Sequence, residues 1–595
     1  MSSQELILIA VIIAAFVLII RVRLRPDLVA LLVLLTLGFT GVVTTQEALS
    51  GFSRSAVITI IGLFIITDAL EETGVIQWLA KRINNIGGGS EKRLLVIFMA
   101  AGAGLSLIMN NIAAGAMLLP AAVRVGRSSN VRLSKLLIPV SFGTLVGGMA
   151  TYLTTANIIM SGLLIDRGED GLNMLSFIPT GGLIVLATIV YMALWGRRFL
   201  PNREGMSESV TSSHLYDTYE LGQRLWEIQV QPESRLVDCP LEQSEIGEKL
   251  GLTVLGIWRG HRAILSPQPS EVIQQDDYLL VLGREERVEQ LEEWGTIFRH
   301  ENFNANGKHN YDVDLFEVVI PPRSSVIGKT LTDINFRKRY GLTAVALWRE
   351  GRSYRTDVGK RNLQVGDALL VVGPTEKFRS FGRDRDFLVL NGNLQQPTHP
   401  EKAAWAVLIT TIVIFLSIVE LVPLPLVMMA GAVGMILTGC LNLDEAYQAV
   451  EWRVVFLIAG MLPISIAMVN TGLAGRIGEA MVGSLQQYGP LALIAGIFAL
   501  TVIVCQVIGG QVTALVVGPI AVSAALQTGV NPQAVAVAVA IGCSTAFLTP
   551  IAHPVNVLMM GPAGYTFNDF FKVGVGMTVV TFIALLAGMV LFWGV

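Results

Sequence analysis

The sequence has little charge and few cysteines. Asp, Glu, Lys and Arg make up 15% of the 595 residues, hydrophobic residues make up 52%, and the formal net charge is −3. This composition is typical of a polytopic membrane protein, and the charge balance gives no reason to expect a nucleic-acid partner. The four cysteines, Cys239, Cys440, Cys505 and Cys543, follow no CxxC or CxxH spacing. Neither a disulfide framework nor a zinc site is therefore indicated.

Charged residues are absent from three long segments. Residues 94–123, 136–165 and 480–568 contain no Asp, Glu, Lys or Arg. Ionisable side chains inside a membrane usually mark ion pathways, so their absence restricts the mechanism. A membrane site built from these segments contains no Arg or Lys. The apolar segments also hold no paired acid and base and no nucleophile set, so we predict a protein that is not an enzyme.

The two ends of the chain resemble each other. Residues 47–74 align with residues 445–472 without a gap, and farther along Pro120 aligns with Pro519 and Asn157 with Asn556. Two membrane-embedded halves of common origin are typical of transporters.

Each half contains five apolar segments and one broken segment. A spanning helix needs about 20 apolar residues. The apolar segments lie near 5–22, 27–44, 55–70, 134–164 and 176–196, and near 403–420, 424–441, 454–470, 533–560 and 573–594. The broken segments, 94–123 and 489–525, are interrupted at residues 109–111 and 509–511. If each broken segment is a re-entrant hairpin, the odd number of crossings inverts the second half relative to the first.

Basic residues indicate the orientation. When the N-terminus is placed outside, only Arg54 and Arg167 of the Lys and Arg residues in the first half fall in outer loops. The positive-inside rule predicts this asymmetry. We therefore expect a multi-pass protein of the plasma membrane, in contact with the lipid bilayer, with both termini outside and the insert between the halves in the cytoplasm.

The insert is itself a tandem repeat. GLTVLGIWRGHR from Gly251 aligns with GLTAVALWREGR from Gly341, and DDYLLVLG ending at Gly283 aligns with GDALLVVG ending at Gly373. Short apolar runs between Gly and charged turns predict two small α/β domains. The predicted domains are a membrane repeat at 1–204, the two inserted domains at 205–305 and 306–398, and a second membrane repeat at 399–595.

These repeats resemble the TrkA-C domain, the C-terminal regulatory (RCK) module of potassium-channel regulators. Two interpretations remain at this point. The pair either regulates the membrane part by binding a small-molecule ligand or forms a dimerising or structural cap without one.

Small, polar and helix-breaking residues interrupt the uncharged segments. Asn110-Asn111 and Thr154-Thr155 lie in the first half, and Gly509-Gly510-Gln511 and His553-Pro554 lie in the second. Helices broken at mid-membrane direct their N-terminal ends at an anion, while exposed carbonyls and Asn side chains bind a cation. An anion is therefore the expected substrate. The alternatives are that the two Asn residues only cap helices and that the two Gly residues form a packing contact.

At these residues the chain resembles the divalent anion:sodium symporter family, in the branch that carries TrkA-C inserts. The first tip reads Asn110-Asn111-Ile112, the first break ends at Asn157, and the second break begins PIAHPVNV at Pro550. The resemblance implies a polytopic α-helical membrane protein with two inverted repeats, each of five spanning helices and one re-entrant hairpin. It also implies a homodimer that works by elevator-type alternating access, with helices near 5–44 and 403–441 as the fixed scaffold.

The resemblance implies binding residues as well. The substrate would contact Asn110, Asn111, Thr154, Thr155, Gly509, Gly510, Gln511, His553 and Pro554. A first transported sodium ion would contact Ser106, Asn110, Asn111, the carbonyl of Leu153 and Asn157. A second would contact Cys505, Ile508, Gly510, the carbonyl of Ala552 and Asn556. No organic cofactor is indicated.

Two departures from the family pattern shape the prediction. Gly510 stands where the second hairpin tip of the family has Asn. The sequence therefore does not decide whether a second sodium site exists. Ile112 replaces a Thr and removes a hydroxyl donor, so a compact oxyanion such as sulfate is favoured, with a dicarboxylate next. We therefore expect a sodium-coupled transporter of a small divalent anion. The alternatives are proton coupling through His553 and an anion channel gated by the TrkA-C-like domains.

Overall fold

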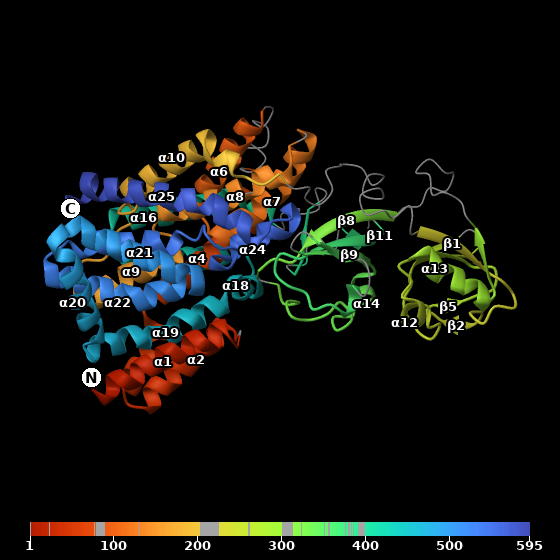
Figure 1. Ribbon diagram of the computed structural model, residues 1–595, viewed down its shortest axis with the longest axis horizontal. Helices are drawn as coiled ribbons and strands as arrows, with labels where there is room; N and C mark the ends of the chain where they lie inside the picture. The colour runs from red at the N-terminus through yellow and green to blue at the C-terminus, as the bar shows by residue number, and fades with distance from the viewer. Residues whose placement is uncertain are drawn as a thin grey trace.

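The computed structural model describes residues 2–22, 24–75, 78, 90–129, 131–202, 225–259, 262–299, 313–322, 324–349, 352–354, 358–374, 377–378, 381, 384, 386–390 and 399–595. The described chain is mostly helical. A large helical body occupies one end of the molecule, and two small β-sheets follow one another at the other end (Figure 1).

The helical body is built from the two ends of the chain. Its first part contains α1 (Ser3–Ile20), α2 (Pro26–Phe39), α3 (Thr45–Leu49), α4 (Ser55–Glu72), α6 (Glu91–Ser106), α7 (Asn111–Ser128), α8 (Leu133–Met149), α9 (Thr155–Asp166) and α10 (Ile178–Leu194). Its second part contains α16 (Ala403–Val419), α17 (Leu424–Leu437), α18 (Leu443–Ala449), α19 (Trp452–Asn470), α20 (Leu473–Leu485), α21 (Pro490–Ile508), α22 (Gly510–Thr528), α23 (Pro532–Ser544), α24 (Pro554–Ala563) and α25 (Phe567–Trp593). Seven helices of the described chain are long and apolar enough to cross a membrane. The chain is a multi-pass membrane protein.

The helix breaks expected from the sequence are present. In the first half α6 ends at Ser106 and α7 begins at Asn111, whereas α21 and α22 are separated only by Gly509. Gly509 has a φ of 80°, a left-handed conformation that glycine adopts without strain. The other two breaks separate α8 from α9 and α23 from α24.

The helices pack in two groups. A framework group consists of α1, α2, α4, α16, α17 and α19, in which α2 packs on α19 and α4 packs on α17. Glycine allows both contacts, since a Cβ at Gly62 would lie 2.8 Å from the Met428 carbonyl and one at Gly460 would lie 2.8 Å from the Ala30 carbonyl carbon. The hairpin group consists of α6 to α10 and α21 to α25. The framework group thus contains α4 and α19 as well as the helices within 5–44 and 403–441.

The two sheets have the same strand order. The first contains β1 (Leu225–Val230), β3 (Thr253–Arg259), β4 (Arg262–Leu265), β6 (Tyr278–Leu282) and β7 (Thr296–Arg299), in the order β4-β3-β6-β1-β7. The second contains β8 (Val313–Val319), β9 (Thr343–Arg349), β10 (Arg352–Tyr354), β11 (Ala368–Pro374) and β12 (Leu388–Val389), in the order β10-β9-β11-β8-β12. The pairings among these strands are antiparallel. A two-stranded sheet of β2 (Cys239–Pro240) and β5 (Val272–Ile273) and the short helices α12 (Ile246–Leu250), α13 (Glu285–Val288) and α14 (Phe336–Tyr340) complete these regions.

A buried ion pair recurs at the same place in each sheet. Arg259 Nη2 lies 2.9 Å from Asp277 Oδ2 in the first, and Arg349 Nη2 lies 2.6 Å from Asp367 Oδ2 in the second. Both carboxylates are buried, at 0% and 1% exposure, and each also accepts a backbone N–H from three residues earlier. The ion pair fixes the Asp-containing turn before β6 and before β11.

The two sheets are also joined to each other. An apolar cluster that includes Leu255 and Leu280 of the first sheet and Leu370 of the second lies between them. Arg337 of α14 donates to the carbonyls of Val254 and Pro267, and burial lowers its pKa to about 10.

Candidate functional site

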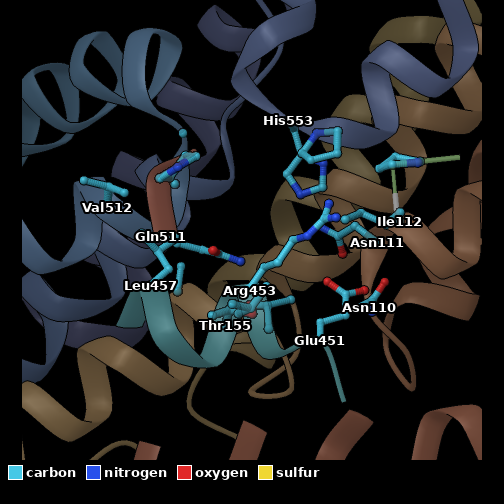
Figure 2. Close-up of a pocket in the computed structure, with 18 of the residues that line it drawn as sticks. Asn110, Asn111, Ile112, Thr155, Glu451, Arg453, Leu457, Gln511, Val512 and His553 are labelled. Carbon is cyan, nitrogen blue, oxygen red and sulfur yellow. The ribbon is translucent and has the colours of Figure 1, made fainter. Parts of the chain in front are cut away.

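A cavity of about 640 Å³ lies where the two helix groups meet. All nine residues that the sequence predicts to bind substrate line it: Asn110, Asn111, Thr154, Thr155, Gly509, Gly510, Gln511, His553 and Pro554. Figure 2 shows Asn110, Asn111, Gln511 and His553 around this space. Residues more than 400 positions apart in the sequence therefore form one site.

Six described helices begin at the wall of the cavity. The first residue of each lines it: Pro26 of α2, Asn111 of α7, Thr155 of α9, Trp452 of α19, Gly510 of α22 and Pro554 of α24. The N-terminal end of a helix carries a partial positive charge of about half a unit and N–H groups without intrahelical partners. A cavity surrounded by such ends favours an anion.

The first hairpin tip is held by its own side chains. Asn110 Oδ1 accepts the N–H of Ala113 at 2.8 Å and so caps α7, while Asn111 Oδ1 accepts the hydroxyl of Ser106. The capping role considered for Asn110 is therefore present. Both residues nevertheless line the cavity, and Ser106 is fully buried behind it.

The side chain of Asn157 bridges the break between α8 and α9, and one of its atoms has no hydrogen-bond partner within the described chain. Its Nδ2 donates to the carbonyls of Gly148 and Thr151, and its side chain is fully buried. Its Oδ1 is a buried oxygen that accepts no hydrogen bond within the described chain. A buried oxygen of this kind is costly unless a ligand or an ordered water contacts it. It is one of the oxygens predicted for the first sodium site.

The matching Asn556 in the second half is fully satisfied. Its Nδ2 donates to the carbonyls of Ala546 and Thr549, and its Oδ1 accepts the hydroxyl of Ser141 at 2.6 Å. Cys505 donates its thiol to the Cys543 carbonyl at 3.0 Å. Two of the residues predicted for a second sodium site thus have their polar atoms in use.

His553 acts as a helix cap. Its Nδ1 accepts the N–H of Val555 at 3.2 Å, which places it at the start of α24. An imidazole that accepts at Nδ1 is neutral in this arrangement.

The prediction that the site contains no Arg or Lys is wrong. Arg453, the second residue of α19, lines the cavity together with Glu451. In Figure 2 its side chain extends toward Asn111 and His553, and Gln511 points toward it. The sequence argument considered only the three uncharged segments, whereas Arg453 comes from the framework group. The one available signal was the Glu-Trp-Arg sequence directly before an apolar helix.

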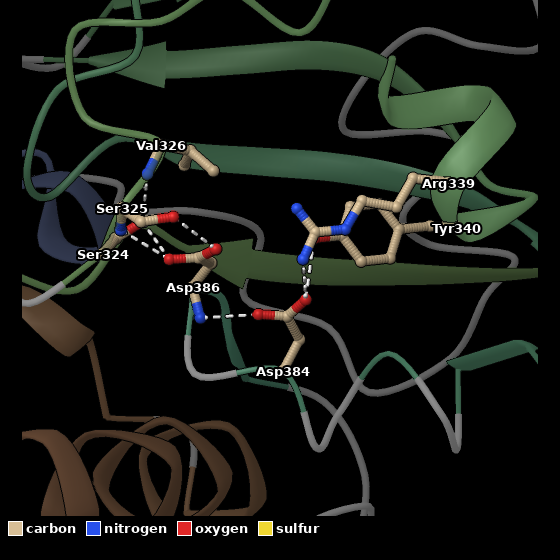
Figure 3. A network of polar contacts seen from close by, with 7 residues as sticks. All are labelled: Ser324, Ser325, Val326, Arg339, Tyr340, Asp384 and Asp386. Carbon is tan, nitrogen blue, oxygen red and sulfur yellow. Dashed lines mark hydrogen bonds and ion pairs between the residues drawn. The ribbon is translucent and has the colours of Figure 1, made fainter. Parts of the chain in front are cut away.

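The cavity reaches the second sheet region. Pro322, which follows β8, lines it, as does Pro26 at the start of α2. The turn after Pro322 is fixed by Asp386, whose carboxylate accepts the hydroxyls of Ser324 and Ser325 (Figure 3). Asp384 accepts the hydroxyl of Tyr340 at 2.7 Å, and burial raises the pKa of this Tyr.

Known proteins match the chain over almost its full length. It is 32% identical to the uncharacterized transporter sll0640 of Synechocystis over 98% of this chain and 97% of that protein. It is 31% identical to the uncharacterized transporter YfbS of Escherichia coli over 98% of each. Sodium/sulfate cotransporter 2 of Chlamydomonas reinhardtii is 27% identical over 48% of this chain and 32% of that protein. The sequence model of the citrate transporter family (CitMHS) matches residues 16–542, so the chain belongs to this family of transporters.

Proposed function

We propose that the protein is a secondary active, sodium-coupled transporter of a small divalent anion, with sulfate as the first candidate. The observation that carries the proposal is the cavity at which six described helices begin. Their partial positive charges, and N–H groups that have no partner within the helix, suit an oxyanion. A dicarboxylate is the next candidate.

Sodium coupling is supported by Asn157. Its Oδ1 is buried without a partner among the described residues, and its Nδ2 donates to Gly148, where a Cβ would lie 2.7 Å from Asn111 Oδ1. Asn157, Asn111, Ser106 and the Leu153 carbonyl would bind one sodium ion as co-substrate. Oxygen ligands suit such a hard cation. Because the Oδ1 of Asn556 accepts a hydrogen bond whereas that of Asn157 accepts none within the described chain, we propose one sodium ion at this site and none at its counterpart.

The residues at the two hairpin tips that line the cavity favour sulfate over citrate as the substrate. Ile112 and Gly509 to Gln511 offer no hydroxyl at either tip, whereas a tricarboxylate needs many donors to replace its hydration. A name among the relatives, sodium/sulfate cotransporter 2, points the same way. The name of the family points to citrate, which is therefore the competitor to test.

The architecture supports alternating access. The reciprocal packing of α2 on α19 and of α4 on α17 is what two inverted repeats would produce. We propose that the framework group is the fixed scaffold of a homodimer, that the hairpin group moves, and that the two sheet regions are TrkA-C-like domains in the cytoplasm. The cavity reaches Pro322, so this conformation would be open to the cytoplasm.

Uptake into liposomes tests the proposal. Purified protein should accumulate radiolabelled sulfate with saturation kinetics when an inward sodium gradient is imposed, and excess unlabelled sulfate should compete better than excess citrate. Uptake driven only by a proton gradient would show that protons, and not sodium ions, are coupled to transport. Currents far above carrier turnover would indicate a channel and overturn the carrier mechanism.

A further inference from the structure

Arg453 is a full positive charge at a site otherwise built from partial ones. It lines the same cavity as Asn110, Asn111 and His553, and its side chain is exposed within the described chain. The residues that the family resemblance assigns to the site do not include it. Its helix, α19, belongs to the framework group, whereas those other residues belong to the hairpin group.

The charge and shape of the guanidinium give Arg453 a role. Each helix end at the cavity supplies about half a charge, which salt screens. Arg453 instead places one whole charge at the cavity wall, and the counterpart of the Asn157 site, where a second sodium ion could bind, has its polar atoms in use. A guanidinium supplies a whole charge and a planar fork of donors that matches two oxygens of one oxyanion.

We propose that Arg453 contacts the transported oxyanion directly and provides the positive charge that a second sodium ion would otherwise provide. This inference rests on the proposed function as an anion transporter. Since α19 and the hairpin group belong to different packing groups, the contact exists only when they face each other as they do here. Arg453 therefore contacts the anion in the conformation whose cavity also reaches Pro322.

Glu451 shares this end of α19 and has interactions of its own. Figure 2 shows it beside Asn110, whereas Arg453 extends toward Asn111 and His553. The charged side chains of Glu451 and Arg453, at the start of α19, thus face different parts of the cavity wall. An anion near Asn111 and His553 lies next to the guanidinium rather than the carboxylate.

Sulfate binding by purified variants tests the contact. In the presence of sodium, Arg453→Gln should raise the dissociation constant for sulfate on the order of tenfold to a hundredfold, the range for a hydrogen bond to a charged partner. Arg453→Lys should recover part of the affinity, because it keeps the charge and loses the fork. The matched control is Lys572→Gln, which removes an exposed positive charge from α25 outside the cavity and should bind sulfate like the parent.

A charge-rescue experiment covers the case in which Arg453→Gln is poorly folded. In a background without the four native cysteines, Arg453→Cys should bind sulfate weakly, recover after reaction with a positively charged aminoethyl thiosulfonate, and not recover after reaction with a negatively charged sulfonatoethyl thiosulfonate. Equal sulfate affinity in the parent and in folded Arg453→Gln, or equal rescue by both reagents, would overturn the contact and leave the proposed function standing. If the parent itself binds neither sulfate nor citrate in sodium, the proposed function fails, and the inference fails with it.

Discussion

Asn157 and Asn556 hold the two helix breaks in the same way, yet one amide oxygen differs. Each donates from Nδ2 to two carbonyls. Ser141 donates to Asn556 Oδ1, while Asn157 Oδ1 is buried with no hydrogen bond from the described residues. The two halves therefore differ at this position. The amide oxygen of Asn157 is available to a cation, whereas that of Asn556 is already hydrogen-bonded.

Replacing Asn157 tests this difference. Asn157→Ala should raise the sodium concentration for half-maximal sulfate uptake by about tenfold or more, because it removes a buried oxygen ligand. Ser141→Ala is the control, since it frees the oxygen of Asn556 and should leave the sodium dependence of the parent in place. Sodium titration of uptake measures both. A folded Asn157→Ala protein with the parental sodium dependence would contradict the assignment.

Gly510 is required by packing. A Cβ at this position would overlap the carbonyl oxygen of Cys543, which is backbone and cannot rotate away. Gly510→Ala should therefore destabilise the protein by about 1–3 kcal/mol, as overpacking does. Gly104→Ala in α6 is the control, because a Cβ there has open space. Thermal unfolding in detergent compares the two, and an unchanged midpoint for Gly510→Ala would refute the packing role.

At the scale of elements, the second sheet region rests on a helix of the cavity. Gly366, in the turn before β11, packs so closely on α24 that a Cβ at Gly561 would overlap its carbonyl oxygen. β8 and β9 also contact α24. Since α24 begins at Pro554 in the cavity wall, the sheet region touches the far end of a helix that lines the site.

Loosening this contact should change the population of conformations. A contact present in one conformation stabilises it, so Gly561→Ala should disfavour the state whose cavity reaches Pro322. A cysteine at Gln511, in a background without the native four, should then react several-fold more slowly with an impermeant reagent applied from the insert side. Gly483→Ala, with open space around it, is the control. Unchanged reactivity would show that the contact does not bias the cavity.

Sequence reasoning identified the breaks and the polar wall because Asn, Gly and Pro are conspicuous within apolar runs. Asn110 and Gly509 mark breaks that the structure contains. It missed Arg453, because only the packing of α19 against the hairpin group brings that residue to the cavity. It also could not tell Asn157 from Asn556, since the distinguishing hydroxyl of Ser141 lies on a different helix.

At the scale of the whole molecule, we predict a single orientation of the chain in the membrane. Ser3 begins α1, and Lys329 lies in the second sheet region between β8 and β9. A single cysteine at Ser3 should react with an impermeant reagent applied from outside. A single cysteine at Lys329 should react only after permeabilisation, because the basic loops of the first half are predicted to face inward. Asn393, a further position in the insert, lies outside the described residues. The reverse labelling pattern would overturn the topology.

The most direct test of the central claim is equilibrium sulfate binding in sodium and in choline at one pH. Anion and cation binding should be mutually dependent, because a sodium ion held by Asn157 and the cavity residue Asn111 would add a whole positive charge near the dianion. Calorimetry on the purified protein should therefore show sulfate binding about tenfold or more tighter in sodium than in choline, as a coupling of this kind gives. Equal affinity in the two salts would contradict sodium coupling.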